Sequence, residues 1–357
     1  MRRLRRLSRR LFLCFLSNEL VMKIKKNAGK FGLRWIVLLV LGLSSDVFAI
    51  QCPSDNFHGF VKEFLAKPEV QRAFTASPIH FLEVVAEGSQ PKVVEREIEV
   101  LGGGELSAVS PEVVEMSSLE VKVQPPNKIF VRDRAGELLK ILTFQKADCW
   151  SLSSLENWSL ETVLDSQVDA SSLPPGERSL MRGKSYADLA MEAEFPASSQ
   201  LYISALDSYM NGADKGSIEA GYQAVLLSLS GQAPRLDDSR ILELLLSAAS
   251  TSGAANLALA NFYCDEGRYD QVRPCADPQK SLNALEAGSK LGSMEALNQL
   301  GLSYERGTLG TKNINRALAC FQAAAAQGFE LSKENAARLI AKNVKTESSN
   351  CLKQEAN

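Results

Sequence analysis

The sequence predicts an α+β N-terminal domain followed by an all-α solenoid of helix hairpins. Three observations predict this order. Short alternating runs of polar and apolar residues, separated by turn residues, occupy positions 50–165, whereas alanine-rich helical spacing occupies 186–345. Within the second region, one helix-hairpin pattern recurs at a nearly fixed distance. Because a single hairpin of this size cannot bury its apolar face, the copies are expected to stack on one another.

Residues 1–49 have the composition of a secretory signal peptide. Basic residues between positions 23 and 34 precede an apolar run at 35–43, and small residues lead up to Ala49. The run is too short to span a bilayer, which takes about 20 residues. Read from Met22 as the true start, the segment favours a cleaved signal over an uncleaved anchor. We therefore expect a periplasmic protein, exported by the general secretory pathway, with no stable membrane insertion after cleavage.

Charge is divided unevenly along the 357 residues. Residues 1–49 hold 11 of the 40 Lys and Arg residues and two of the 42 acids, so the rest of the chain has 29 basic and 40 acidic residues, a net charge of −11. Binding to a phosphate backbone depends on clustered Lys and Arg. We therefore expect no nucleic-acid partner.

Six cysteines remain once the signal is removed. An even number in an oxidising compartment suggests disulfides. Cys264 and Cys275 close a short loop and are the firmest pair, while the other four leave several connectivities open. Cys52 and Cys149 bracket the N-terminal domain, and Cys320 and Cys351 are placed to tie the tail at 346–357 to the last repeat. No metal site is expected, since no two cysteines have C-x-x-C spacing and no histidine follows position 80.

The α+β domain is expected at 50–165. Apolar residues at helical spacing predict a helix at 56–65, and a proline in its first turn predicts a second helix at 68–74. Alternation and turn signals predict strands at 79–85, 119–123, 128–132 and 137–144, and Trp150-Ser151-Leu152 is expected to close the domain. Linker composition at 166–185, rich in Ser and Pro, separates this domain from the helical region.

The first and last elements of this domain carry a weak resemblance to a known fold. The residues concerned are Phe57, Phe60, Phe64, Gln71 and Arg72 at the start and Phe144, Trp150 and Leu152 at the end. With a helical start and a curved antiparallel sheet, the layout resembles the cone-shaped nuclear-transport-factor-like domains of bacterial envelope proteins. The resemblance implies a fold, and such cones often hold a pocket.

The repeat is established by counting. Ser281, Leu285, Gly288 and Gly292 recur 36 positions later as Ala317, Phe321, Ala324 and Gly328. On the first helices, Ala255, Leu259, Ala260 and Tyr263 recur 41 positions later as Ala296, Leu300, Gly301 and Tyr304. The difference of five residues predicts a longer loop inside the earlier hairpin, and that loop holds both Cys264 and Cys275. A degraded earlier unit begins at Gly216, and a last helix at 332–341 is expected to cap the stack.

This pattern resembles the Sel-one-like repeats, which are relatives of the tetratricopeptide repeat. The match covers about 130 residues, from Gly216 to Ile340, and is best in the unit that starts at Gly292. Leu285 and Gly288 depart from it, because an aromatic residue and Ala are usual at those positions. The resemblance implies a non-enzymatic scaffold that binds other proteins.

No catalytic constellation is evident in the sequence. His58 and His80 are the only histidines, and each is read as a structural side chain. Gly102-Gly103-Gly104 lacks the Lys-Ser or Lys-Thr of a phosphate loop and is read as a turn between strands. We therefore expect neither enzymatic activity nor a cofactor.

The sequence-based hypothesis is a periplasmic interaction scaffold that binds an envelope protein or a secreted effector. The expected contact surface is the concave face of the solenoid with the loop closed by Cys264 and Cys275. In that loop the side chains expected to project toward a partner are those of Arg268, Tyr269, Gln271 and Arg273. The competing interpretation is that these side chains are solvated and contact no partner. A sharper form is an immunity protein against a type VI secretion effector. The alternatives are small-ligand binding by the N-terminal domain and a role in envelope assembly.

Overall fold

The computed structural model describes residues 51–99, 119–167, 172–268, 273–345 and 350–352. The signal peptide expected at 1–49 and the turn expected at Gly102 to Gly104 lie outside these ranges.

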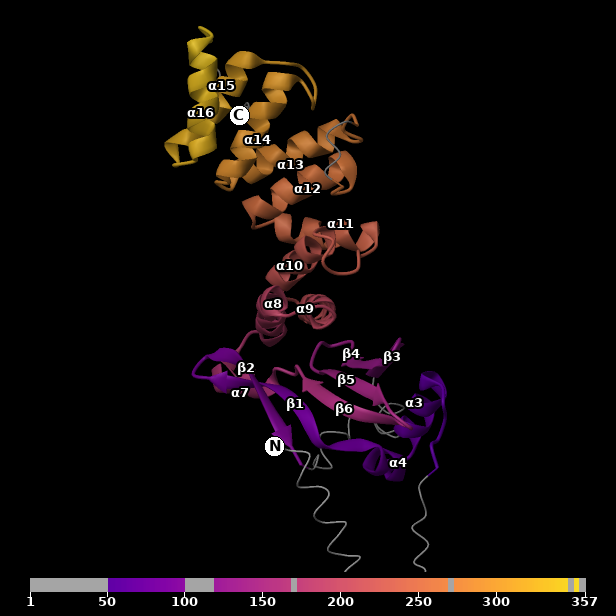
Figure 1. Cartoon of the computed structure of the whole chain (residues 1–357). Coiled ribbons are helices and arrows are strands. Elements are labelled where there is room, and N and C mark those ends of the chain that lie inside the picture. The colour runs from indigo at the N-terminus through magenta and orange to yellow at the C-terminus, as the bar shows by residue number, and fades with distance from the viewer. Residues whose placement is uncertain (1–50, 100–118, 168–171, 269–272, 346–349, 353–357) are drawn as a thin grey trace, which may run out of the picture. The chain divides into compact units, whose positions relative to one another are not determined.

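The N-terminal part is a six-stranded sheet preceded by two helices (Figure 1). The helices are α3 (Phe57–Ala66) and α4 (Pro68–Ala73). The strands are β1 (Thr75–Glu87), β2 (Gln90–Ile98), β3 (Leu119–Gln124), β4 (Lys128–Asp133), β5 (Leu139–Lys146) and β6 (Trp150–Asn157). The four predicted strands are present as β1, β3, β4 and β5, whereas β2 and β6 were not predicted as strands.

The strand order is β2-β1-β6-β5-β4-β3. Every neighbouring pair is antiparallel except β1 and β6, which run parallel with Phe81 opposite Leu155. The expectation of a purely antiparallel sheet is therefore wrong at this one pair. Strand β1 of the β1–β2 hairpin pairs with β6 of the β3–β6 meander. Because these two strands lie far apart in the chain, no hairpin turn forces them to be antiparallel.

The two faces of the sheet are covered by different helices. On one face Phe60 and Phe64 of α3 pack edge-on against Phe144 of β5, with ring centroids 5.8 and 5.1 Å apart. All three rings are completely buried, so aromatic side chains fill the space beneath α3. On the other face Leu139 and Ile141 join a cluster that continues into the helical region.

Helix α8 (Glu177–Glu192) begins inside the segment 166–185 that was expected to be a linker. Its Arg182 is 1% exposed and donates to Glu161 of α7 (Glu161–Gln167) at 2.7 Å and to the Ala135 carbonyl at 3.2 Å. The neighbouring Gly136 has φ +71°, and an added Cβ would lie 2.8 Å from the Ser204 carbonyl oxygen. These contacts fix the β4–β5 turn against the first solenoid helices, which a linker would not do.

The helical region is a succession of helices, each packed against the next (Figure 1). They continue as α9 (Ala197–Asp214), α10 (Ile218–Leu229), α11 (Asp238–Ala249), α12 (Gly253–Asp265), α13 (Pro278–Lys290), α14 (Met294–Arg306), α15 (Ile314–Ala326) and α16 (Glu330–Ala341). Every regular element described after position 160 is helical, which confirms the predicted fold class.

Helices α8 and α9 form a further hairpin of the same kind, which the sequence analysis did not recognise as a repeat. Gly183 and Tyr186 stand 118 positions before Gly301 and Tyr304. On α9 the residues Ala205, Tyr209, Gly212 and Gly216 stand 112 positions before Ala317, Phe321, Ala324 and Gly328. The stack therefore begins directly on the sheet.

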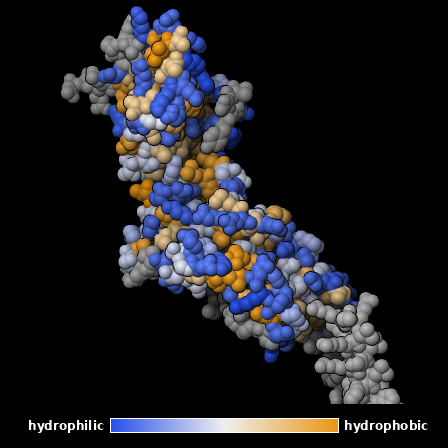
Figure 2. Space-filling view, turned by 60° about the vertical axis from the view of Figure 1, so that its left-hand side comes forward, coloured by the Kyte–Doolittle hydropathy of each residue, from blue (hydrophilic) through white to orange (hydrophobic). Residues whose placement is uncertain are grey.

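The surface of the protein mixes polar and apolar side chains. On the face drawn in Figure 2, hydrophobic residues form separate patches among hydrophilic ones. Among the large apolar side chains that the structure describes, the two most exposed are Phe195 at 82% and Met191 at 71%, near the turn between α8 and α9. Single exposed apolar residues are ordinary, but two such neighbours mark a surface for closer study.

Candidate protein-binding groove

The hairpins that begin with α10, α12 and α14 start in the same way, because these helices share a Ser-x-x-Ala sequence. Each serine side chain caps its helix by accepting the backbone N–H of the alanine three residues later, at 3.1–3.2 Å. The pairs are Ser217 with Ala220, Ser252 with Ala255, and Ser293 with Ala296. All three alanines are completely buried, so the small side chain lets the next helix approach closely.

Tyr263 and Tyr304 occupy equivalent positions in successive hairpins. Lys280 Nζ lies 5.5 Å from the ring centroid of Tyr263, and Arg316 Cζ lies 4.3 Å from that of Tyr304. Lys280 and Arg316 are themselves 36 positions apart, which is the offset of the second helices. The predicted equivalence of the two tyrosines is therefore present in three dimensions.

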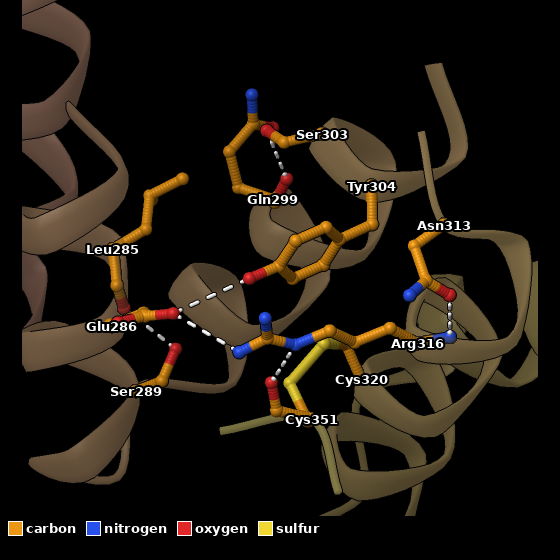
Figure 3. The surroundings of a disulfide bond; sticks show 10 residues. All are labelled: Leu285, Glu286, Ser289, Gln299, Ser303, Tyr304, Asn313, Arg316, Cys320 and Cys351. Atoms are coloured by element: carbon orange, nitrogen blue, oxygen red, sulfur yellow. Dashed lines mark hydrogen bonds and ion pairs between the residues drawn. A yellow bond between two sulfur atoms is a disulfide. The ribbon is translucent and has the colours of Figure 1, made fainter. Parts of the chain in front are cut away.

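Arg316 also anchors the end of the chain (Figure 3). It donates to the Cys351 carbonyl at 2.8 Å and to Glu286 of α13 at 3.1 Å, and Cys351 is joined to Cys320 of α15 by a disulfide. The Tyr304 hydroxyl donates to the same Glu286 carboxylate at 3.3 Å. Burial raises the pKa of Tyr304 to about 12, so the phenol stays protonated and keeps this hydrogen bond at neutral pH. The last two hairpins and the tail are thus held together.

Two adjoining hollows form a groove beside these hairpins, which we name the hairpin groove. They have volumes of about 430 and 350 Å³ and share Ser303 and Leu309. The disulfide between Cys264 and Cys275 forms part of the wall of the larger hollow. Its other lining side chains include two basic residues, Arg273 and Arg306, one acid, Asp265, and the apolar Leu302. The groove therefore combines basic and apolar groups on a covalently fixed frame.

The four predicted contact residues differ in whether they line the hairpin groove. Arg273 is exposed and lines the hairpin groove. Arg268 is 58% exposed and forms an ion pair with Glu266 at 2.6 Å, without lining the groove. Tyr269 and Gln271 lie outside the described residues. Arg306 and Leu309 also line the groove and were not predicted, because their only signal is their place on either side of Gly307 in the loop of the best-matching repeat.

All three disulfides are pairings considered from the sequence. They join Cys52 to Cys149, Cys264 to Cys275, and Cys320 to Cys351.

The histidines are placed apart from the groove. His58 is exposed on α3. His80 lies on β1 between Glu95 and Glu97, with nitrogen–oxygen distances of 3.7 and 3.6 Å. Within the described ranges, no three His, Cys, Asp or Glu side chains gather as metal ligands would, and no helix has the length and hydrophobicity to cross a bilayer.

Comparison with families of known sequence gives no match, and neither does comparison with curated proteins. Among solved structures, the chain is similar to a protective antigen of uropathogenic Escherichia coli with an SLR fold, at 19% identity and a TM-score of 0.40, over 48% of this chain and 34% of that one. It is similar to a Sel1 repeat protein from Oxalobacter formigenes at 16% identity and a TM-score of 0.42, over 54% of this chain and 73% of that one. A Sel1 repeat protein from Klebsiella pneumoniae matches at 18% identity and a TM-score of 0.31, over 50% of this chain and 82% of that one.

The chain spans about a third of the length of the Escherichia coli protein. The repeat is recognised in this chain by its recurring serine caps and its equivalent tyrosines. By these internal features its helical region is a stack of hairpins similar to Sel-one-like repeats.

Proposed function

We propose that this protein is an exported, non-enzymatic scaffold that binds another protein in the hairpin groove. The observation that carries the proposal is a groove with basic and apolar walls, built on stacked hairpins and closed at one side by a disulfide. Repeat stacks of this kind offer extended surfaces. The disulfide between Cys264 and Cys275 holds these two residues together, so they lose little conformational freedom on binding, which favours affinity.

The chemistry of the groove indicates what the partner presents. Arg306 supplies positive charge, beside Arg273 and Asp265, which already take part in other interactions, and Leu302 and Leu309 supply apolar area. Arginine is enriched at the energetic centres of protein interfaces because its guanidinium combines charge with flat contact area. The partner segment is therefore one that carries carboxylates next to an apolar side chain.

Export is supported by the cysteines. Three disulfides are rare in reduced compartments and common in the periplasm. This agrees with the signal peptide expected at 1–49, and we assign the protein to the periplasm on these two grounds.

Within this class, we favour an immunity protein that blocks an effector delivered by a type VI secretion system. A strain that lacks the protein would then be killed by its parent strain during contact-dependent competition. An envelope-assembly factor would instead give a membrane-integrity defect without any rival cell. Small-ligand binding by the N-terminal domain is the remaining alternative. Because the aromatic rings of Phe60, Phe64 and Phe144 fill the space beneath α3, such a ligand would bind elsewhere on the sheet.

The groove is tested by photo-crosslinking in the native host. A crosslinking amino acid at Leu309 is expected to capture one partner, whereas the same group at Leu331, which is 51% exposed on α16, is not. Arg306→Glu should abolish the capture at Leu309. Equal capture at both positions, or capture unaffected by Arg306→Glu, would show that the groove is not the binding surface.

A further inference from the structure

A second cleft lies between the sheet and the end of α8. Its volume is about 590 Å³. Strand residues line one side, and the turn between α8 and α9 lines the other. The floor is apolar, with Trp158 and Leu189 only 5% and 7% exposed. We name it the sheet cleft, and it shares no lining residue with the hairpin groove.

The sheet cleft has an excess of negative charge. Four carboxylates line it, from Glu95, Glu156, Glu192 and Glu194. The lining cation Lys128 is already engaged, since it donates to Thr143 at 3.0 Å and lies 3.8 Å from Glu156. His80 is the other basic side chain and stands between two glutamates.

The carboxylates at the rim are available to a partner. Glu192 and Glu194 are both exposed, and neither forms an ion pair within the described part of the chain. Both flank the turn that carries Phe195. Two unpaired carboxylates beside an apolar floor attract a cation more strongly than the same groups would in open solvent, because the floor lowers the local dielectric constant.

Phe195 adds an apolar contact at the same rim. Most of its ring is in contact with water, although the ring belongs to the lining of the cleft. An aromatic ring next to carboxylates fits a lysine or arginine, whose cationic head stacks on the ring while its stem covers apolar surface.

We propose that the sheet cleft docks a cationic, partly apolar peptide segment of a partner protein. Charge complementarity selects this occupant. A second copy of the chain is a poor fit, since residues 50–357 carry a net charge of −11. Nucleic acid would be repelled by the four carboxylates. The proposal goes beyond the hairpin groove, which presents basic groups and calls for a partner segment of opposite charge.

The test uses fluorescence anisotropy with the purified, oxidised protein. The probe is a short labelled peptide of alternating lysine and leucine. Two comparison peptides replace every lysine by glutamate or every leucine by serine. The lysine–leucine peptide is expected to bind at least about tenfold more tightly than either, and to weaken as salt is raised.

Matched variants locate the binding. Glu192→Gln with Glu194→Gln should weaken the peptide by about threefold to tenfold, because each exposed ion pair contributes modestly. Glu69→Gln with Glu334→Gln removes the same charge from exposed positions outside the cleft and should leave binding unchanged.

The apolar contact has its own pair of variants. Phe195→Ser should weaken the peptide by about tenfold, as loss of an aromatic anchor does, while Leu331→Ser on α16 should have no effect. Absence of peptide binding, or equal losses in the cleft variants and their controls, would overturn the proposal. Because none of these residues lines the hairpin groove, failure of the crosslinking experiment leaves this test unaffected.

Discussion

The contact between Gly301 and Phe321 makes a sharp test of how the hairpins pack. A Cβ added at Gly301 would lie 2.6 Å from Phe321 Cε1, whereas ordinary contacts of a Cβ begin near 3.4 Å. In Gly301→Ala the ring would therefore have to move by about 0.8 Å. Phe321 is completely buried, so its neighbours oppose that movement.

The magnitude follows from two opposing effects. Replacing Gly by Ala inside a helix stabilises it by about 1 kcal/mol. Overpacking a close-packed core costs about 1–3 kcal/mol. Because a rigid, buried ring is the obstacle, we expect the upper half of that range, and a net loss of about 1–2 kcal/mol in the free energy of unfolding.

The preceding hairpin suggests the compensating change. Ala260 and Leu285 are the equivalents of Gly301 and Phe321. The double variant Gly301→Ala with Phe321→Leu recreates that pair. It should be more stable than the sum of the single variants implies by about 1 kcal/mol or more.

Urea unfolding followed by circular dichroism measures all three variants. Gly221→Ala is the control, because its Cβ would meet only the flexible tip of Leu244, at 2.9 Å, and it should stay within about 1 kcal/mol of wild type. The reasoning is refuted if Gly301→Ala is as stable as wild type, or if the double variant shows simple additivity.

Three further predictions concern single features of the fold. Burial raises the pKa of Asp207 to about 6, above its value near 3.9 in the unfolded chain. Between about pH 4 and 6 the folded protein therefore binds more protons than the unfolded chain, so the free energy of unfolding falls as pH rises. Asp207→Asn should flatten this part of the measured pH–stability curve. Replacing Cys264 and Cys275 by serine should cost about 2–3 kcal/mol and raise hydrogen exchange in α12 and α13 without affecting the sheet. The buried Tyr186 hydroxyl has no hydrogen-bond partner among the described residues, so Tyr186→Phe should raise the thermal midpoint, and a lower midpoint would contradict this.

The hairpins from α10 to α15 were predictable because the pattern that makes them is local. Serine caps and small residues act within one helix or across one turn, so their spacing in the sequence is their spacing in space. The tyrosine equivalence followed from two constant offsets, and the structure places Tyr263 and Tyr304 under equivalent cations.

The first hairpin escaped notice because a charge interrupts its apolar pattern. Arg182 stands where the last full repeat has Leu300, and a charged residue at a core position usually argues against a core. Only the folded chain brings Glu161 and the Ala135 carbonyl to its guanidinium. Partners that distant in sequence leave no local signal.

The sheet cleft was unpredictable for the same reason. Glu95 lies on β2, Glu156 on β6 and Glu192 on α8, and nothing in the sequence links three such separate acids. In contrast, Arg273 was predictable as a surface residue because it lies inside a loop that two cysteines close.

Pairwise compensation explains how the repeat survives its own degradation. In the first and last of the four hairpins a glycine lies against an aromatic ring of the second helix, and the equivalent positions of the two hairpins between them hold an aliphatic residue and a leucine. In chain order the pairs are Gly183 with Tyr209, Val225 with Leu245, Ala260 with Leu285, and Gly301 with Phe321. Both members of each pair are buried in a close-packed core, so the residue at one position limits the size of the residue at the other: glycine admits an aromatic ring and alanine admits leucine, whereas Val225 with Leu245 is the larger exception. A comparison of one sequence position at a time therefore fails to recognise a repeat first where two facing residues have changed together.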